Sequence, residues 1–250
     1  MKFILFSFFL NTTLICSIQA QEDAVIESNP FAEARYNYFK ETVIVFNEYL
    51  NTDSGSFNTT DFRILKPIGK KDWNLRLDVP LVSTNTNSIN KTGLGDIAFA
   101  VAYIIQLNEK RGIGARAKVI SNSASNPSFG SGKWIFNPTV FYGLYLDKSR
   151  KLLWLPDVEY QISFAGASDR NDISVGVLEN VLIYSFGKNW VSGDVAFRYN
   201  EVLEGFQNSA YVEFGRKLNK ESMFYIHPSI GFGDKKAYNT GLEVGLVILY

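Results

Sequence analysis

Apolar and polar residues alternate one by one along most of the chain. Residues 73–79 place Trp, two Leu and Val at odd positions, and Asn, Arg and Asp at even positions. Residues 134–146, 152–164, 222–232 and 240–250 follow the same scheme. Because successive side chains of a strand point to opposite faces, this period predicts β-strands with one apolar and one polar face.

Two further segments alternate less cleanly: residues 41–49, and residues 173–184, where Glu179 falls on the apolar parity. A β-bulge or an error of register would explain either. In total we predict twelve strands, over approximately 39–49, 59–67, 73–82, 95–107, 112–120, 134–146, 152–164, 173–186, 190–200, 210–218, 222–232 and 240–250.

Short and long connections alternate strictly between these segments. Five connections are short and basic, at 69–72, 108–111, 147–150, 187–189 and 219–221. The other six are longer and mostly rich in Asn, Ser, Thr and Gly, such as 83–94 and 121–133. This alternation of short and long connections is typical of a barrel with tight periplasmic turns and longer external loops. An even number of strands places both termini in the periplasm. We therefore predict an all-β fold: an up-and-down antiparallel transmembrane β-barrel of about 12 strands.

The first twenty residues have the form of a secretory signal. Lys2 precedes the apolar run 3–10, and Ala20 stands before a polar junction. The run is too short for a transmembrane helix, and the longest later apolar run, 97–105, has nine residues. We divide the chain into a cleaved signal peptide at 1–20, a periplasmic lead-in at 21–38 and a β-barrel at 39–250. The alternative for the acidic part of the lead-in is a plug inside the barrel.

Both the tryptophans and the carboxyl terminus fit a membrane barrel. All four tryptophans lie near predicted strand ends, where an indole can bury its ring and keep its N–H among head groups; four ordinary core tryptophans are the alternative.

The last strand, ending at Tyr250, resembles the signal read by the outer-membrane barrel assembly machinery. We expect this machinery and outer-membrane lipids as partners, and the outer membrane of a Gram-negative bacterium as the location.

Several short motifs resemble a known family. They are Leu-Arg-Leu-Asp-Val-Pro-Leu-Val-Ser-Thr-Asn at 75–85, Gly-Leu-Gly-Asp-Ile at 93–97, and Gly-Ser-Gly-Lys-Trp at 130–134 with Asn137-Pro138 soon after. Together they resemble the outer-membrane family labelled as meta-pathway phenol-degradation or transporter-like proteins, over about residues 60–165. The resemblance implies a barrel and the passage of small, often hydrophobic compounds. It brings no agreed functional residues.

Charge and composition exclude several function classes. The chain has 25 basic and 25 acidic residues, so no global field attracts nucleic acid. Its single cysteine lies in the predicted signal peptide, which leaves the mature chain without disulfides. The sequence contains no metal-ligand cluster, phosphate-binding loop or nucleotide fingerprint. We expect no cofactor and no metal.

The polar parity defines the candidate pore lining, on the assumption that it faces inward. These residues are Arg63, Arg76, Asp78, Asp96, Arg116, Lys118, Asp157, Glu159, Asp194, Arg198, Glu213, His227 and Glu243. We expect Arg76 and Asp78 to lie beside Asp96, and Asp96 beside Arg116 and Lys118, because neighbouring strands are about 4.8 Å apart. The network either serves only to compensate buried charges or forms a pore with opposed charged walls.

Three functions remain open at this stage. The first is a narrow channel for passive uptake of a small-molecule solute, hydrophobic or amphipathic compounds included. The second is an outer-membrane lipid hydrolase that uses His227, Ser229 and Glu243 as base, nucleophile and orienting acid. The inward parity of these residues disfavours it, because lipid lies outside the barrel, and we expect no enzyme. The third is a non-channel barrel that is structural or binds a partner through loops such as 121–133.

Overall fold

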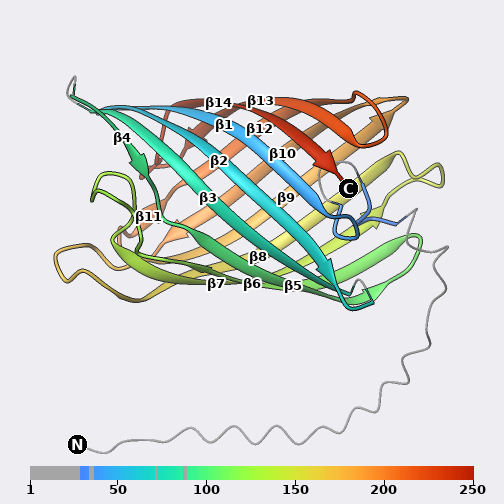
Figure 1. Cartoon of the computed structure of the whole chain (residues 1–250), viewed down its shortest axis with the longest axis horizontal. Helices are drawn as coiled ribbons and strands as arrows, with labels where there is room; N and C mark the ends of the chain where they lie inside the picture. Colours follow the sequence, from blue (N-terminus) through green and yellow to red (C-terminus); the bar gives the residue numbers. More distant parts are fainter. Residues whose placement is uncertain (1–28, 34–36, 71, 87–88) are drawn as a thin grey trace, which may run out of the picture.

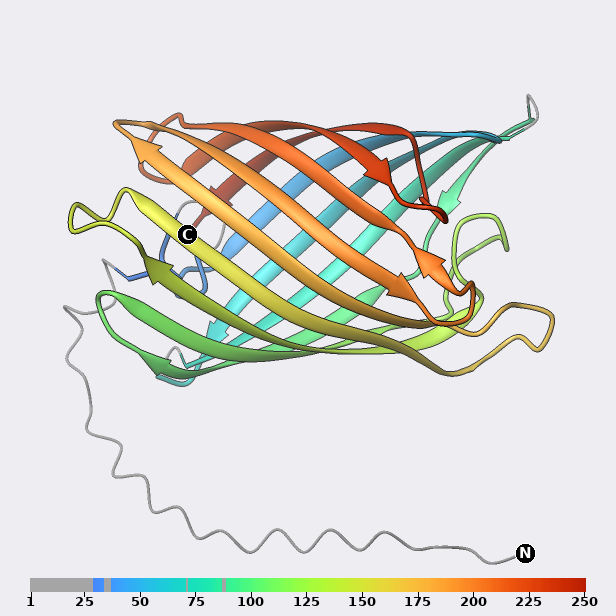
Figure 2. The same cartoon turned by 180° about the vertical axis from the view of Figure 1, so that it is seen from behind.

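The computed structural model of the chain is a single antiparallel β-barrel (Figures 1 and 2). It describes residues 29–33, 37–70, 72–86 and 89–250, so the predicted signal peptide and the first part of the lead-in lie outside the described residues. No helix in these ranges is long and apolar enough to cross a membrane. The strands are β1 (Thr42–Thr52), β2 (Gly55–Ile68), β3 (Trp73–Thr86), β4 (Ile89–Leu94), β5 (Ala98–Leu107), β6 (Arg111–Ile120), β7 (Lys133–Tyr145), β8 (Leu152–Gly166), β9 (Ser174–Phe186), β10 (Asn189–Asn200), β11 (Gly205–Phe206), β12 (Asn208–Lys217), β13 (Ser222–Phe232) and β14 (Thr240–Leu249).

The described strands occupy twelve positions in the wall, which confirms the predicted fold. Apart from the short strands β4 and β11, each strand pairs with the strands before and after it, and β1 pairs with β14 to close the barrel. One part of β3 pairs with β5 and the next part with β4, so β4 and β5 share one position. Similarly, the two-residue β11 and the longer β12 both pair with β10.

The two ends of the barrel differ in their connections. The short basic turns lie at one end together with the carboxyl terminus, on the right in Figure 1, as the sequence predicted. At the other end, two predicted loops are largely strand instead. β1 and β2 are joined by a tight turn at Asp53–Ser54, and residues 83–86 of β3 pair with residues 89–92 of β4. Their Asn, Ser and Thr content suggested loops, but these polar strands extend beyond the apolar band, where both faces meet water.

Side chains alternate between the outside and the lumen as predicted. On β3, Trp73, Leu77 and Leu81 are exposed on the outer surface, whereas Asn74 and Asp78 are buried inside. An apolar outer surface and a polar interior are the arrangement that a bilayer requires of a β-barrel.

Strand β9 explains the irregular position of Glu179. Its pairing with both neighbours is continuous, so no bulge is present. Val177 and Val181 are buried in the lumen on either side of Glu179, while Leu178 and Leu182 are exposed outside. Both faces of this strand are therefore apolar, and alternation alone could not show which one faced inward.

The tryptophan prediction holds only in part. Trp73 and Trp134 are exposed on the outer surface near strand ends. Trp190 also begins a strand, but its side chain is 3% exposed and its indole N–H donates to Glu213 at 2.7 Å inside the lumen. Expecting a membrane interface for Trp190 was wrong because this position has inward parity on β10.

The indole of Trp190 lies directly over Gly215 of β12, where a Cβ atom would come within 1.9 Å of the ring. We predict that Gly215→Val forces the indole out of place and lowers the free energy of unfolding by about 1–3 kcal/mol. Gly193→Val is the matched control, because no atom lies within 4 Å of its Cβ position. Denaturant unfolding from lipid vesicles measures both variants, and equal stabilities would contradict this packing.

Candidate functional site

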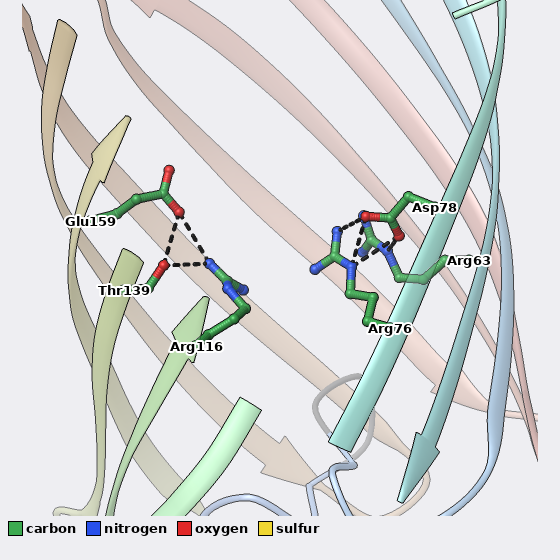
Figure 3. A network of polar contacts seen from close by, with 6 residues as sticks. All are labelled: Arg63, Arg76, Asp78, Arg116, Thr139 and Glu159. Atoms are coloured by element: carbon green, nitrogen blue, oxygen red, sulfur yellow. Dashed lines mark hydrogen bonds and ion pairs between the residues drawn. The ribbon is translucent and has the colours of Figure 1, made fainter. Parts of the chain in front are cut away.

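The first lumen network joins β2 and β3. Asp78 accepts a hydrogen bond from Arg63 Nε at 2.7 Å, and its other oxygen lies 2.6 Å from Arg76 Nη2 (Figure 3). Arg63 and Asp78 are direct register partners, whereas Arg76 is two residues away on the strand of Asp78. The guanidinium of Arg63 also lies 4.9 Å from the centre of the Phe46 ring. One carboxylate thus compensates two guanidinium groups.

The second network joins β6, β7 and β8. Arg116 Nη2 donates to Thr139 Oγ1 and to Glu159 Oε2, each at 3.1 Å (Figure 3). Gln161 Nε2 donates to the other oxygen of Glu159 at 2.7 Å. Both arginine–carboxylate groups project into the lumen, and β5 separates them in the wall.

Strand β5 has only small side chains between these two networks. Its inward residues there are Ala98, Ala100 and Ala102, all buried. Ala100 is the register partner of Arg76 on one side and of Lys118 on the other. No side chain larger than a methyl group therefore separates the cations of β3 from those of β6.

The opposite part of the lumen wall is acidic. Asp157 of β8 is the register partner of Glu179 of β9, and Asp194 follows on β10, where it is 3% exposed. Arg198 lies on the same inward row, further toward the long-loop end, and donates to Ser209 Oγ at 2.5 Å. The lumen therefore has a basic side and an acidic side.

Most of the predicted pore-lining residues do occupy the inward rows, but Asp96 does not. The prediction treated 95–107 as one strand, whereas β4 ends at Leu94 and β5 begins at Ala98. Asp96 therefore leaves the alternation, and its carboxylate accepts backbone N–H bonds from Ser123 at 3.1 Å and Ser131 at 2.8 Å. It anchors the 121–132 loop. The Gly95-Asp96 pair, a common turn sequence, was the available signal.

The expected chain of contacts through Asp96 is consequently wrong. Asp78 pairs with Arg63 of β2 instead, and Arg116 pairs with Glu159 across β7. Sequence analysis also missed two lumen residues, Asp61 and Glu179. Asp61 shares the inward parity of Arg63, two residues away, so alternation could have identified it.

At the long-loop end of the barrel, the ammonium of Lys133 forms a further ion pair. It donates to Asp172 of the β8–β9 loop at 2.8 Å. This hydrogen bond and positive charge hold the pKa of the Asp172 carboxyl below its ordinary value.

The residues of the hydrolase hypothesis lie in a different arrangement. His227 Nδ1 faces Glu213 at 3.5 Å, and His227 Nε2 faces Glu243 at 3.6 Å. Its ring stacks on Tyr211 with centroids 4.3 Å apart. Since both ring nitrogens face carboxylates, His227 has no nitrogen available to take a proton from Ser229. All of these residues face the lumen, away from lipid, so this geometry opposes lipid hydrolysis.

Part of the lead-in lies inside the barrel at the short-turn end. The ring of Phe31 is 1% exposed and packs edge-on against Phe141 of β7 at 5.2 Å, while Tyr38 stacks on Phe141 at 5.3 Å. The Tyr145 hydroxyl donates to the carbonyl of Asn29 at 3.2 Å. Residues 29–33 and 37–39 therefore narrow the lumen at this end.

Glycines on the wall make room for this segment. A Cβ at Gly112 would lie 2.5 Å from the Phe31 ring, and a Cβ at Gly143 would lie 2.7 Å from Pro30. Beside it, inward apolar residues form a cluster that surrounds much of the short-turn end: Ile44, Tyr145, Leu153, Val181, Ile183, Trp190, Met223, Tyr225, Val247 and Leu249. Sequence alternation gave no sign of this packing, because the lead-in is not a strand.

Comparison with solved structures identifies the fold. The COG4313 outer membrane channel from Pseudomonas putida F1 matches with a TM-score of 0.73 at 12% identity, covering 87% of this chain and 100% of that one. The NanC porin matches with a TM-score of 0.61 at 12% identity, covering 82% and 98%. The KdgM porin matches with a TM-score of 0.58 at 11% identity, covering 84% and 99%. No family model and no curated protein matches the sequence. The chain thus has the fold of outer-membrane channels.

No group of three or more His, Cys, Asp and Glu side chains in the described ranges is arranged to hold a metal ion. The arginine–carboxylate networks remain the principal polar feature of the lumen.

We predict that Asp78→Asn destabilises the barrel by roughly 3 kcal/mol, because it leaves two largely buried guanidinium groups without their carboxylate. The side chains of Arg63 and Arg76 are each 18% exposed. Glu41→Gln is the control, since it breaks the exposed Glu41–Lys66 pair and should cost less than about 1 kcal/mol. Equal losses in denaturant unfolding would show that the buried pairing is unimportant.

Proposed function

We propose that this protein is a narrow outer-membrane channel for passive uptake of small solutes, with amphipathic and hydrophobic compounds among them. The observation that carries the proposal is a closed barrel whose lumen has a basic side, an acidic side and apolar rows. A wall with opposed charges orients a solute that has a charged end, and the inward valines of β9 offer contact to an apolar body.

The fold supports the same conclusion. Twelve strands enclose an interior between that of a filled eight-stranded barrel and that of an open sixteen-stranded porin. Solved structures of similar fold include a channel and two porins, and KdgM has been solved in complex with disordered oligogalacturonate. The motifs at 75–85, 93–97 and 130–138 further suggest a relationship to the meta-pathway phenol-degradation or transporter-like family.

In planar bilayers, we expect the protein to give discrete conductance steps of small size. Replacing Phe31 and Tyr38 together by alanine should raise the single-channel conductance, because these rings narrow the short-turn end. The matched control replaces Phe99 and Tyr103 by alanine, a phenylalanine and a tyrosine on the outer face of β5, and should leave conductance unchanged. A correctly folded barrel that conducts no ions would contradict the channel function.

A further inference from the structure

Lys118 is a lumen cation without a partner. It lies on the inward row of β6, two residues from Arg116, and its register partner is the fully buried Asn137 of β7. In the described part of the chain its ammonium makes no hydrogen bond and no ion pair. The charged groups whose electrostatic influence reaches it include Arg116 and Arg76 on the basic side, and Glu159 and Asp78. It therefore lies among charges that already have partners.

Three of the four cations on this side of the lumen already have carboxylate partners. Arg63 and Arg76 pair with Asp78, and Arg116 pairs with Glu159. Lys118 is the cation of this group that forms no ion pair in the described ranges. In addition, the buried Nε of Arg116 has no hydrogen-bond partner in the described ranges. The Lys118 ammonium and Arg116 Nε are thus two unpaired donors on the inward row of β6.

Only small side chains project from the neighbouring strand next to these donors. Ala100 lies between Arg76 and Lys118 in register, so only a methyl group projects from β5 at that level. Toward the short-turn end, the stacked rings of Tyr38 and Phe141 begin two residues beyond Thr139 on the inward row of β7. A group that binds at Lys118 would have donors on one side and aromatic carbon on the other.

We propose that Lys118, with Arg76 and Arg116 on either side, is the binding subsite for the carboxylate of a small amphipathic organic anion. This deepens the proposed channel function by naming the solute class. A monocarboxylate matches the one cation that has no ion pair, whereas a phosphate dianion would need more unpaired donors than this wall offers. The acidic wall formed by Asp157, Glu179 and Asp194 repels the same carboxylate and so directs it toward Lys118.

Calorimetric titration of the folded protein in detergent tests the subsite with benzoate as the probe. We expect Lys118→Gln to weaken benzoate binding roughly tenfold, as expected for the loss of one charge-assisted hydrogen bond. Lys118→Arg should retain most of the affinity. Arg198→Gln is the matched control, because it removes the same charge from a different part of the lumen wall and should change affinity by less than about twofold.

Several outcomes would overturn the proposal. They are no benzoate binding by the unmodified protein, equal losses in Lys118→Gln and Arg198→Gln, or equally tight binding of the neutral analogue benzamide. Tighter binding of inorganic phosphate than of benzoate would also reject the carboxylate class. A heat-modifiability gel first confirms that each variant is folded, and Lys118→Arg remains informative if Lys118→Gln does not fold.

The titration does not require ion conduction, so the two proposals fail separately. If the protein gives no conductance in planar bilayers but binds benzoate in a Lys118-dependent way, the channel function is rejected and the subsite is kept. If it gives discrete conductance steps but its benzoate affinity does not depend on Lys118, the channel function is kept and the subsite is rejected.

Discussion

The closed ladder of backbone hydrogen bonds is the constraint on which this structure depends. In hydrocarbon there is no water to satisfy an unpaired N–H or C=O, so a sheet that spans a bilayer can have no free edge. Here the first and last strands close the barrel through ten register pairs, from Thr42 with Leu249 to Asn51 with Thr240. The turns, the strand lengths and the two faces all follow from that closure.

Closure also determines where charge can lie. Once every strand is paired on both sides, each side chain faces either lipid or the lumen, and charged side chains must face the lumen. They are then crowded into a narrow space, where a strand separation of about 4.8 Å brings opposite charges on neighbouring strands into contact. The pair of Arg63 with Asp78 arises in this way, and the contact of Arg116 with Glu159 spans one more strand. The charged residues of the lumen therefore compensate one another within the barrel.

Alternation predicted the barrel because it reports this two-sided environment directly. It failed wherever a residue leaves the strand or both faces are apolar. Asp96 lies in a break between two strands, so its parity had no meaning, and Glu179 lies among inward valines that look like outward ones. Trp190 shows the same limit, since an aromatic residue near a strand end suits the interface and the lumen equally well.

Pairing partners were harder to predict than faces. Sequence identifies which strands are neighbours in an up-and-down barrel, but an arginine side chain is long enough to reach along its own strand or across two. Arg76 therefore binds Asp78 two residues away, where the sequence suggested the next strand. The contacts of the lead-in could not be predicted either. This segment is not a strand, so its sequence has no alternation of apolar and polar residues from which an inward face could be read.

The lead-in differs from the wall in how it is held. Its contacts with the barrel are side-chain ones: the Phe31 and Tyr38 rings on Phe141, the Tyr145 hydroxyl on a carbonyl, and the Asn74 amide on the carbonyl of Tyr38 at 3.0 Å. None of the wall's ladder hydrogen bonds involves its described residues, 29–33 and 37–38, since the first pairs of β1 begin at Thr42. The narrowing of the lumen and the closure of the barrel therefore depend on different groups. Side chains make the first at the short-turn end, and paired backbone groups make the second.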